Sequence, residues 1–158
     1  MKNNSFAMLE ALLAEVGQIR GRKKFQKIVH ILKVKGADFN ESFDYHYFGP
    51  YSSELQLELD EMTSKGILKE EEGANGCYEY SLAYEGKDVS EKIPYSDLAN
   101  YLNNQQPQVL ELVSTFYYLL EHGVKDFDTA VQKAAALKPH LAHRIETAKE
   151  VYDFVEKI

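Results

Sequence analysis

The strongest constraint on the fold is a change of hydrophobic period at Gly66. Before Gly66, apolar residues recur every three or four positions in residues 6–16, 22–35 and 52–65, which predicts three helices. After it, residues alternate on both sides of Asn75-Gly76, a turn sequence that supplies the positive φ angles of a tight hairpin. Three helices followed by a hairpin is the order of a winged-helix unit. We therefore expect an α+β fold, mostly α, with a winged-helix-like core.

A short strand is expected between the second and third helices. Residues 43–48 alternate aromatic and polar side chains, and Gly49-Pro50 follows them directly. Glycine permits the unusual backbone angles before a helix, and proline fixes the entry to it. We therefore interpret Gly49 and Pro50 as a structural turn that ends the strand.

The last third of the chain returns to a helical period. Pro94 and the polar residues 103–106 interrupt the pattern, and Pro107 suits the first position of a helix. Apolar stripes then predict further helices up to the end of the chain. We expect two parts: a winged-helix-like core of residues 1–92 and a helical subdomain of residues 93–158 packed on it.

Composition limits the classes of partner and the compartment. The formal net charge is −7, which argues against a constitutive nucleic-acid binder. A single cysteine, Cys77, excludes an intrachain disulfide and a cysteine-based zinc cluster. No apolar run approaches the length of a membrane span, and residues 1–5 lack the features of a signal peptide. We therefore expect a soluble, cytoplasmic protein without a membrane partner.

The charges are unevenly placed. No carboxylate lies between Glu15 and Asp38, a stretch with seven cations, whereas residues 54–72 hold seven carboxylates and two lysines. The start of the second helix could bind an anion or an acidic partner, because its backbone N–H groups also favour negative charge. The candidate residues are Arg20, Arg22, Lys23, Lys24 and Lys27. The alternative, which we favour, is that these cations pair with the acidic third helix and hairpin.

Aromatic residues gather just before the third helix. The candidates for an aromatic contact are Tyr45, Tyr47, Phe48 and Tyr51. They could anchor a partner or stack on bases, because tyrosine combines a large apolar area with a polar tip. The favoured alternative is structural: an alternating strand packs Phe43, Tyr45 and Tyr47 onto helices.

The sequence contains no recognisable catalytic or metal-binding motif. Cys77 lies beside the predicted hairpin turn and has no recognisable base or glycine elbow. His140, His143 and Glu146 follow one another at intervals of three residues, which is not the His-Glu-x-x-His spacing of the zinc motif. We therefore interpret them as a solvated helix face. We therefore predict no catalytic residue, no metal and no cofactor, and a protein that is not an enzyme.

Several segments together resemble a known family. Residues 21–29, the run Tyr47-Phe48-Gly49-Pro50-Tyr51-Ser52 and the residues from Gly66 to Leu68 resemble the uncharacterised bacterial YwgA-like proteins, over roughly residues 20–87. More distantly they resemble the Panacea-type antitoxin domain. The first resemblance implies no particular activity. The second implies binding of a protein partner, such as a toxin or a protease.

The leading hypothesis is a non-enzymatic interaction or regulatory module that binds a protein partner or a second copy of itself. The alternative is a winged-helix transcriptional regulator that binds DNA as a dimer. It is disfavoured because the expected recognition helix carries Glu54, Glu58, Asp60 and Glu61, which would face phosphates. A third class, an enzyme acting on a nucleotide or phosphate ester, depends on an anion site at the basic helix start.

Overall fold

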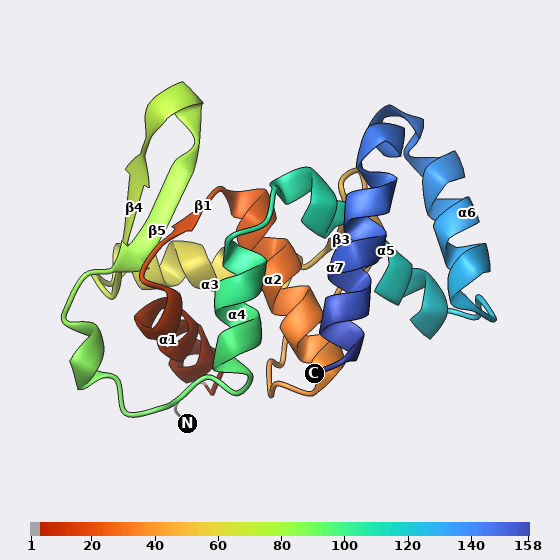
Figure 1. Cartoon of the computed structure of the whole chain (residues 1–158). Helices are drawn as coiled ribbons and strands as arrows, with labels where there is room; N and C mark the ends of the chain where they lie inside the picture. The colour runs from red at the N-terminus through yellow and green to blue at the C-terminus, as the bar shows by residue number, and fades with distance from the viewer. Residues whose placement is uncertain (1–3) are drawn as a thin grey trace.

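The computed structural model describes residues 4–158, and the polar start at residues 1–3 lies outside them. Seven α-helices and two small antiparallel sheets form the described chain, which confirms the predicted α+β, mostly α class. Three short 3₁₀ helices, η1–η3, complete it (Figure 1). The elements are α1 Asn4–Val16, β1 Ile19–Arg20, α2 Arg22–Lys35, β2 Asp44–His46, β3 Gly49–Tyr51, α3 Ser53–Ser64, β4 Leu68–Glu72, η1 Ala74–Gly76, β5 Tyr78–Leu82, η2 Gly86–Asp88, α4 Ser96–Asn103, α5 Pro107–Glu121, α6 Phe127–Leu137, η3 Pro139–Arg144 and α7 Ile145–Glu156.

Side-chain caps mark where two of the helices begin. The Ser52 hydroxyl accepts a hydrogen bond from the backbone N–H of Leu55 at 3.0 Å and so caps α3. The Asp126 carboxylate accepts from the N–H of Thr129 at 2.8 Å and caps α6. The chain from Pro139 first forms η3, and α7 begins only at Ile145.

The larger sheet has the strand order β1-β5-β4 with antiparallel pairing throughout. Asn75 and Gly76 have φ angles of 62° and 73°, which confirms the predicted turn between β4 and β5. β1 was not predicted; it is two residues long and pairs Ile19 with Tyr80. The β4–β5 hairpin projects from one end of the molecule, and α6 lies at the other (Figure 1).

A second hairpin corrects the prediction for residues 43–51. Gly49 and Pro50 do not end a strand; they begin β3, which returns along β2 and pairs Asp44 with Tyr51. Gly49 has a φ of 92°, a conformation that glycine adopts without strain. The two residues between the strands, Tyr47 and Phe48, are not typical turn formers, so the sequence contains no ordinary signal for this hairpin.

One hydrophobic core joins the two predicted parts of the chain. It includes Phe6 of α1, Phe25 of α2, Leu98 of α4, Phe116 of α5 and Val155 of α7. α2 packs against α5, and α1 packs against α4, so helices from both sides of residue 92 share this core. β3 also contacts α2 and α5. The β2–β3 hairpin is therefore seated where the two halves of the chain meet.

Candidate functional site

The β2–β3 hairpin, residues 44–51, presents aromatic side chains to solvent, and we call it the aromatic hairpin. Tyr47 is 87% exposed and Phe48 is 52% exposed. Their rings meet edge to face with centroids 4.8 Å apart. With His46 and Tyr51 they line a shallow hollow of about 200 Å³. Exposed aromatic residues grouped around a hollow are typical of surfaces that bind another molecule.

The favoured packing interpretation of these aromatic residues is wrong in part. Phe43 packs against the hydrophobic core as expected, but Tyr45 and Tyr47 are exposed. Tyr45 still contacts Tyr118 of α5, with ring centroids 5.6 Å apart. The reason is that all three residues of β2 are exposed, so this strand does not bury alternate side chains against the helices. Instead, backbone carbonyl groups of the hairpin face the interior.

Beneath the hairpin lies a group of charged side chains that we call the lysine cluster: Lys23, Lys27, Glu111 and Lys138. Glu111 of α5 is central, because its Oε1 lies 2.6 Å from Lys23 Nζ and its Oε2 lies 2.7 Å from Lys138 Nζ. The Glu111 and Lys138 side chains are only 1% and 2% exposed. Three lysines thus surround one carboxylate in a site largely shielded from water.

Two of these lysines hold the backbone of the hairpin. Lys27 Nζ donates a hydrogen bond to the carbonyl of Pro50 at 2.6 Å, and Lys138 Nζ donates to the carbonyl of Tyr47 at 3.4 Å. Burial lowers the pKa of Lys27 to about 7; Glu111 opposes this change and the neighbouring Lys23 and Lys138 reinforce it. The aromatic hairpin is therefore fixed through its carbonyl oxygens by buried amino groups.

Gly49 allows the hairpin to approach α5 closely. A Cβ atom at this position would lie 3.0 Å from Thr115 Oγ1 and 3.6 Å from Glu111 Cγ. A larger residue would require Thr115 or β3 to shift by a few tenths of an ångström, in addition to the strain of the positive φ angle. Gly49 therefore does not end a strand as predicted; it begins β3 and lies close to α5.

Cations also contact the aromatic rings. Lys23 Nζ lies 4.9 Å from the centroid of the Phe48 ring, and Lys138 Nζ lies 5.3 Å from that of Tyr45. Such cation–π contacts add to the backbone hydrogen bonds. The lysine cluster therefore supports the hairpin from below through both its backbone and its side chains.

The remaining cations of the predicted basic stretch serve other parts of the fold. Arg20 pairs with Glu79 of β5 at 2.9 Å, and Lys24 donates to the carbonyl of Asn103 at 2.8 Å. Arg22 donates from Nε and Nη2 to Glu70 Oε2 of β4, at 3.3 Å and 3.0 Å. The structure therefore divides the stretch: Arg20 and Arg22 turn to the sheet, whereas Lys23 and Lys27 lie under the aromatic hairpin.

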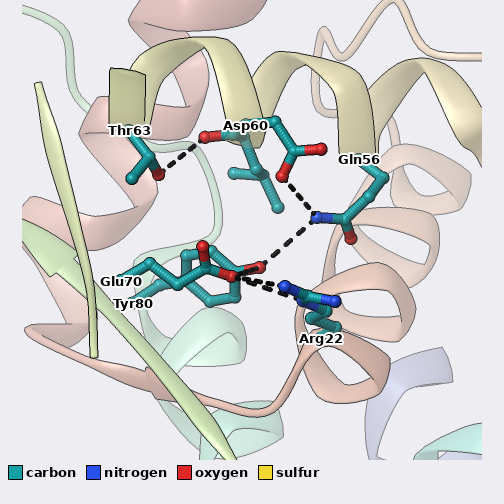
Figure 2. Close-up of polar contacts among 7 residues, drawn as sticks. Arg22, Gln56, Asp60, Thr63, Glu70 and Tyr80 are labelled. Carbon is teal, nitrogen blue, oxygen red and sulfur yellow. Dashed lines mark hydrogen bonds and ion pairs between the residues drawn. The ribbon is translucent and has the colours of Figure 1, made fainter. Parts of the chain in front are cut away.

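Figure 2 shows the Arg22 contacts, in which Glu70 is shared by side chains from α2 and β5. The Tyr80 hydroxyl donates to Glu70 Oε2 at 2.8 Å, and Gln56 Nε2 of α3 lies 3.4 Å from the Tyr80 hydroxyl oxygen. Burial and the bond to Glu70 raise the pKa of Tyr80 to about 12. This network ties the β4–β5 hairpin to α2 and α3 and leaves Arg22 with its charge paired inside the chain.

Sequence reasoning missed Glu111, Thr115 and Lys138. Glu111 is the one carboxylate in the apolar stripe of α5, and a charge on a buried helix face is a usable signal. Lys138 lies at a helix end, where a solvated lysine is the ordinary expectation. Neither position indicates its partner, because the contacts join residues that are far apart in the sequence.

Other predicted positions remain apart from the aromatic hairpin. The Cys77 thiol is exposed beside the turn that follows β4, and His140 and His143 are exposed on η3. Within residues 4–158, no group of three or more His, Cys, Asp or Glu side chains is arranged to hold a metal ion. No helix in the same range is long and apolar enough to cross a membrane.

Comparison with known proteins gives one informative similarity. The chain is 32% identical over 160 residues to the uncharacterized protein YwgA of Bacillus subtilis strain 168, covering 96% of this chain and 95% of that protein. No protein-family model matches, and no solved structure matches. The more distant resemblance to the Panacea-type domain receives no support from these comparisons. At this identity and coverage, the chain belongs to the YwgA-like family.

Proposed function

We propose that this protein is a non-enzymatic interaction module that binds a protein partner through the aromatic hairpin. The observation that carries the proposal is the exposure of Tyr47 and Phe48 on a hairpin whose backbone is held by buried lysines. A binding surface gains from such support, because a side chain ordered before binding loses less conformational entropy on association. Tyrosine is also among the residues that contribute most to protein–protein contacts.

The charges around the hairpin favour a partner with acidic or neutral groups. Lys23 is partly exposed, lies against the Phe48 ring and is paired with Glu111. Arg20 and Arg22 are more exposed, but their charges are engaged with Glu79 and Glu70. The proposal therefore rests on the aromatic residues, with Lys23 as the one candidate cation of the basic stretch beside them.

The winged-helix assignment of the core is part of this proposal. Its support is the order α1, β1, α2, α3, β4 and β5, in which a three-stranded antiparallel sheet ends in a projecting hairpin. The aromatic hairpin is an insertion between α2 and α3 of this order. Such an insertion is a natural place for a family-specific binding surface, because connecting segments vary more than the elements that they join.

Binding of DNA through α3 is not part of the proposal. The exposed residues of α3 include Glu54, Asp60 and Glu61, which would repel phosphates in a groove. The cations that could compensate, Arg20 and Arg22, already pair with carboxylates of the sheet. An enzymatic role at a phosphate site has no more support, since Lys27 is buried and bonded to Pro50.

The test compares the aromatic hairpin with another exposed apolar residue. The double variant Tyr47→Ser, Phe48→Ser removes the two most exposed rings of the hairpin, and Leu57→Ser on α3 is the control, since Leu57 is 67% exposed. Each tagged full-length chain is purified from cells that naturally express the protein, and self-association is followed by sedimentation. We expect the native chain and the control to retain the same partner, or the same dimer, and the double variant to lose it. A partner retained by all three chains would contradict the proposal.

A further inference from the structure

A second cavity lies between α2 and α5, beside the base of the aromatic hairpin. Its volume is about 200 Å³, below the usual range for drug-sized ligands, so it suits a small molecule. Its walls include His30 and Lys33 from α2, Phe43 before β2, and Tyr118 and Glu121 from α5. These side chains combine aromatic walls with a few polar groups, which is the usual composition of a ligand site.

His30 is the least expected residue in this cavity. It is 3% exposed, and its Nδ1 lies 2.6 Å from the hydroxyl oxygen of Ser114, which is fully buried. No other described residue bonds that hydroxyl, and a buried hydroxyl proton without an acceptor is unfavourable. We therefore assign the hydroxyl proton to the bond with Nδ1, which leaves the imidazole proton on Nε2.

The imidazole is neutral at ordinary pH. Burial lowers the pKa of His30 to about 3, and the electrostatic effects of Lys27, Lys33 and His122 act in the same direction. No hydrogen bond joins Nε2 to any residue between 4 and 158. Because His30 lines the cavity, its Nε2–H is an unused donor available to a ligand there.

The other walls define the shape and charge of that ligand. The Lys33 ammonium, which donates to the carbonyl of Glu41, brings a positive charge to the same cavity. The Phe43 ring lies 5.0 Å from the His30 ring, and the Tyr118 ring stacks on His122 at 3.9 Å. Glu121 lies at the same cavity and disfavours a multiply charged anion.

We propose that this cavity binds a small aromatic monocarboxylate. Its carboxylate accepts a hydrogen bond from His30 Nε2–H and pairs with the Lys33 ammonium, while its ring lies between Phe43 and Tyr118. The site is separate from the exposed rings of Tyr47 and Phe48, so this inference does not depend on the proposed protein contact. Ser114 has no catalytic part in it, because its hydroxyl is buried behind the imidazole.

Benzoate is the probe that tests this inference, with the full-length protein titrated by NMR and by calorimetry. We expect saturable binding in the millimolar range or tighter, with the largest shifts at His30, Phe43 and Tyr118. His30→Gln and Lys33→Met should each weaken it about tenfold or more, whereas His143→Gln, at an exposed histidine, should leave it unchanged. Circular dichroism and the melting temperature show whether each variant is folded, so that either of the two can carry the test.

Three further ligands test the charge, the aromatic ring and the single carboxylate of the proposed ligand separately. Benzamidinium, a cation of nearly the same shape, should bind more weakly than benzoate. Tighter binding of benzamidinium would show that the negative charge of Glu121 decides the preferred ligand, and it would overturn the assignment of a carboxylate. Cyclohexanecarboxylate and inorganic phosphate should also bind more weakly; equal binding of either would overturn the aromatic or the monocarboxylate assignment. No saturable benzoate binding, or equal binding by His30→Gln, would overturn the site itself. The Tyr47→Ser, Phe48→Ser chain should bind benzoate normally even if it loses its protein partner.

Discussion

Single residues decide whether the lysine cluster stabilises or destabilises the protein. Glu111 is its one carboxylate and lies within 2.7 Å of both Lys23 Nζ and Lys138 Nζ. An ammonium that is buried without a counter-charge is costly, whereas a pair that is buried and bonded is tolerated. Glu111 is therefore the residue on which the support of the aromatic hairpin depends most.

Replacing Glu111 should destabilise the whole protein. We expect Glu111→Gln to lower the free energy of unfolding by about 3 kcal/mol, because Lys138 stays buried without its carboxylate. Glu61→Gln is the matched control, since Glu61 pairs with Lys65 at the surface, where such pairs contribute less than about 1 kcal/mol. Urea unfolding of both variants measures the difference. Equal, small losses in the two variants would show that the cluster is not a buried ion-pair network.

His30 should make the stability depend on pH in a definite direction. The pKa of His30 is about 3 in the folded chain and 6.5 as the reference for the unfolded one, so below pH 6.5 only the unfolded chain takes up this proton. The contribution of neutral His30 to the free energy of unfolding is therefore fully present above pH 6.5 and is lost as the pH falls towards 3. Relative to the native chain, His30→Gln should regain up to about 3 kcal/mol between pH 7 and pH 4. For the control His143→Gln, we expect the free energy of unfolding to change with pH as it does in the native chain. The same pH dependence in His30→Gln would contradict the assignment.

Among the elements, the aromatic hairpin lies in close contact with α5 at Gly49, where an added Cβ would be tightly packed. Gly49 and Gly123 both have positive φ angles, of 92° and 99°. A Cβ at Gly49 would meet Thr115 Oγ1 at 3.0 Å, whereas a Cβ at Gly123 would meet nothing within 4 Å. Substitution of Gly123 therefore measures the cost of the backbone conformation alone, and substitution of Gly49 measures that cost together with the cost of the contact.

We expect Gly49→Ala to destabilise the protein by about 1–3 kcal/mol more than Gly123→Ala, because overpacking adds to the shared backbone strain. The amide protons of β2 and β3 should also exchange faster in Gly49→Ala. Chemical unfolding and hydrogen exchange measure the two effects. The same loss in both variants, with unchanged exchange in the hairpin, would mean that the approach of β3 to α5 is not tight.

The elements also show what the sequence could and could not predict. Hydrophobic period predicted α1, α2 and α3, and Asn75-Gly76 predicted the β4–β5 turn, because these signals act between neighbours in the chain. β1 is too short for any period to be visible. The return of β3 along β2 depends on Lys27 of α2, Thr115 of α5 and Lys138 at the junction of α6 and η3, which are far apart in the sequence. The sequence therefore offered Tyr47 and Phe48 as contact candidates and Lys23 and Lys27 as part of a basic stretch, but it did not predict that Glu111, Thr115 and Lys138 lie beside them.

In the whole molecule, the cations of the basic stretch pair with several different elements. The net charge of −7 conceals a basic stretch whose members pair with β4, β5 and α5. The expectation that these cations pair within the chain agrees with the contacts of Arg20 and Arg22 with the sheet. Lys23 instead reaches α5 and links the first half of the chain to the second. The aromatic hairpin lies above this junction, and the exposure of Tyr47 and Phe48 there is the reason that we propose it as the binding surface.

Site-specific photo-crosslinking tests that central claim most directly. A photoreactive phenylalanine analogue is placed at Phe48 in one chain and at Leu57 in another, since both positions are exposed. Each full-length chain is irradiated in the cells that naturally express the protein, and the cross-linked products are identified by mass spectrometry. The account predicts one dominant protein product, another protein or a second copy of this chain, from position 48 and little of it from position 57. The same product in equal yield from both positions, or none from position 48, would contradict it.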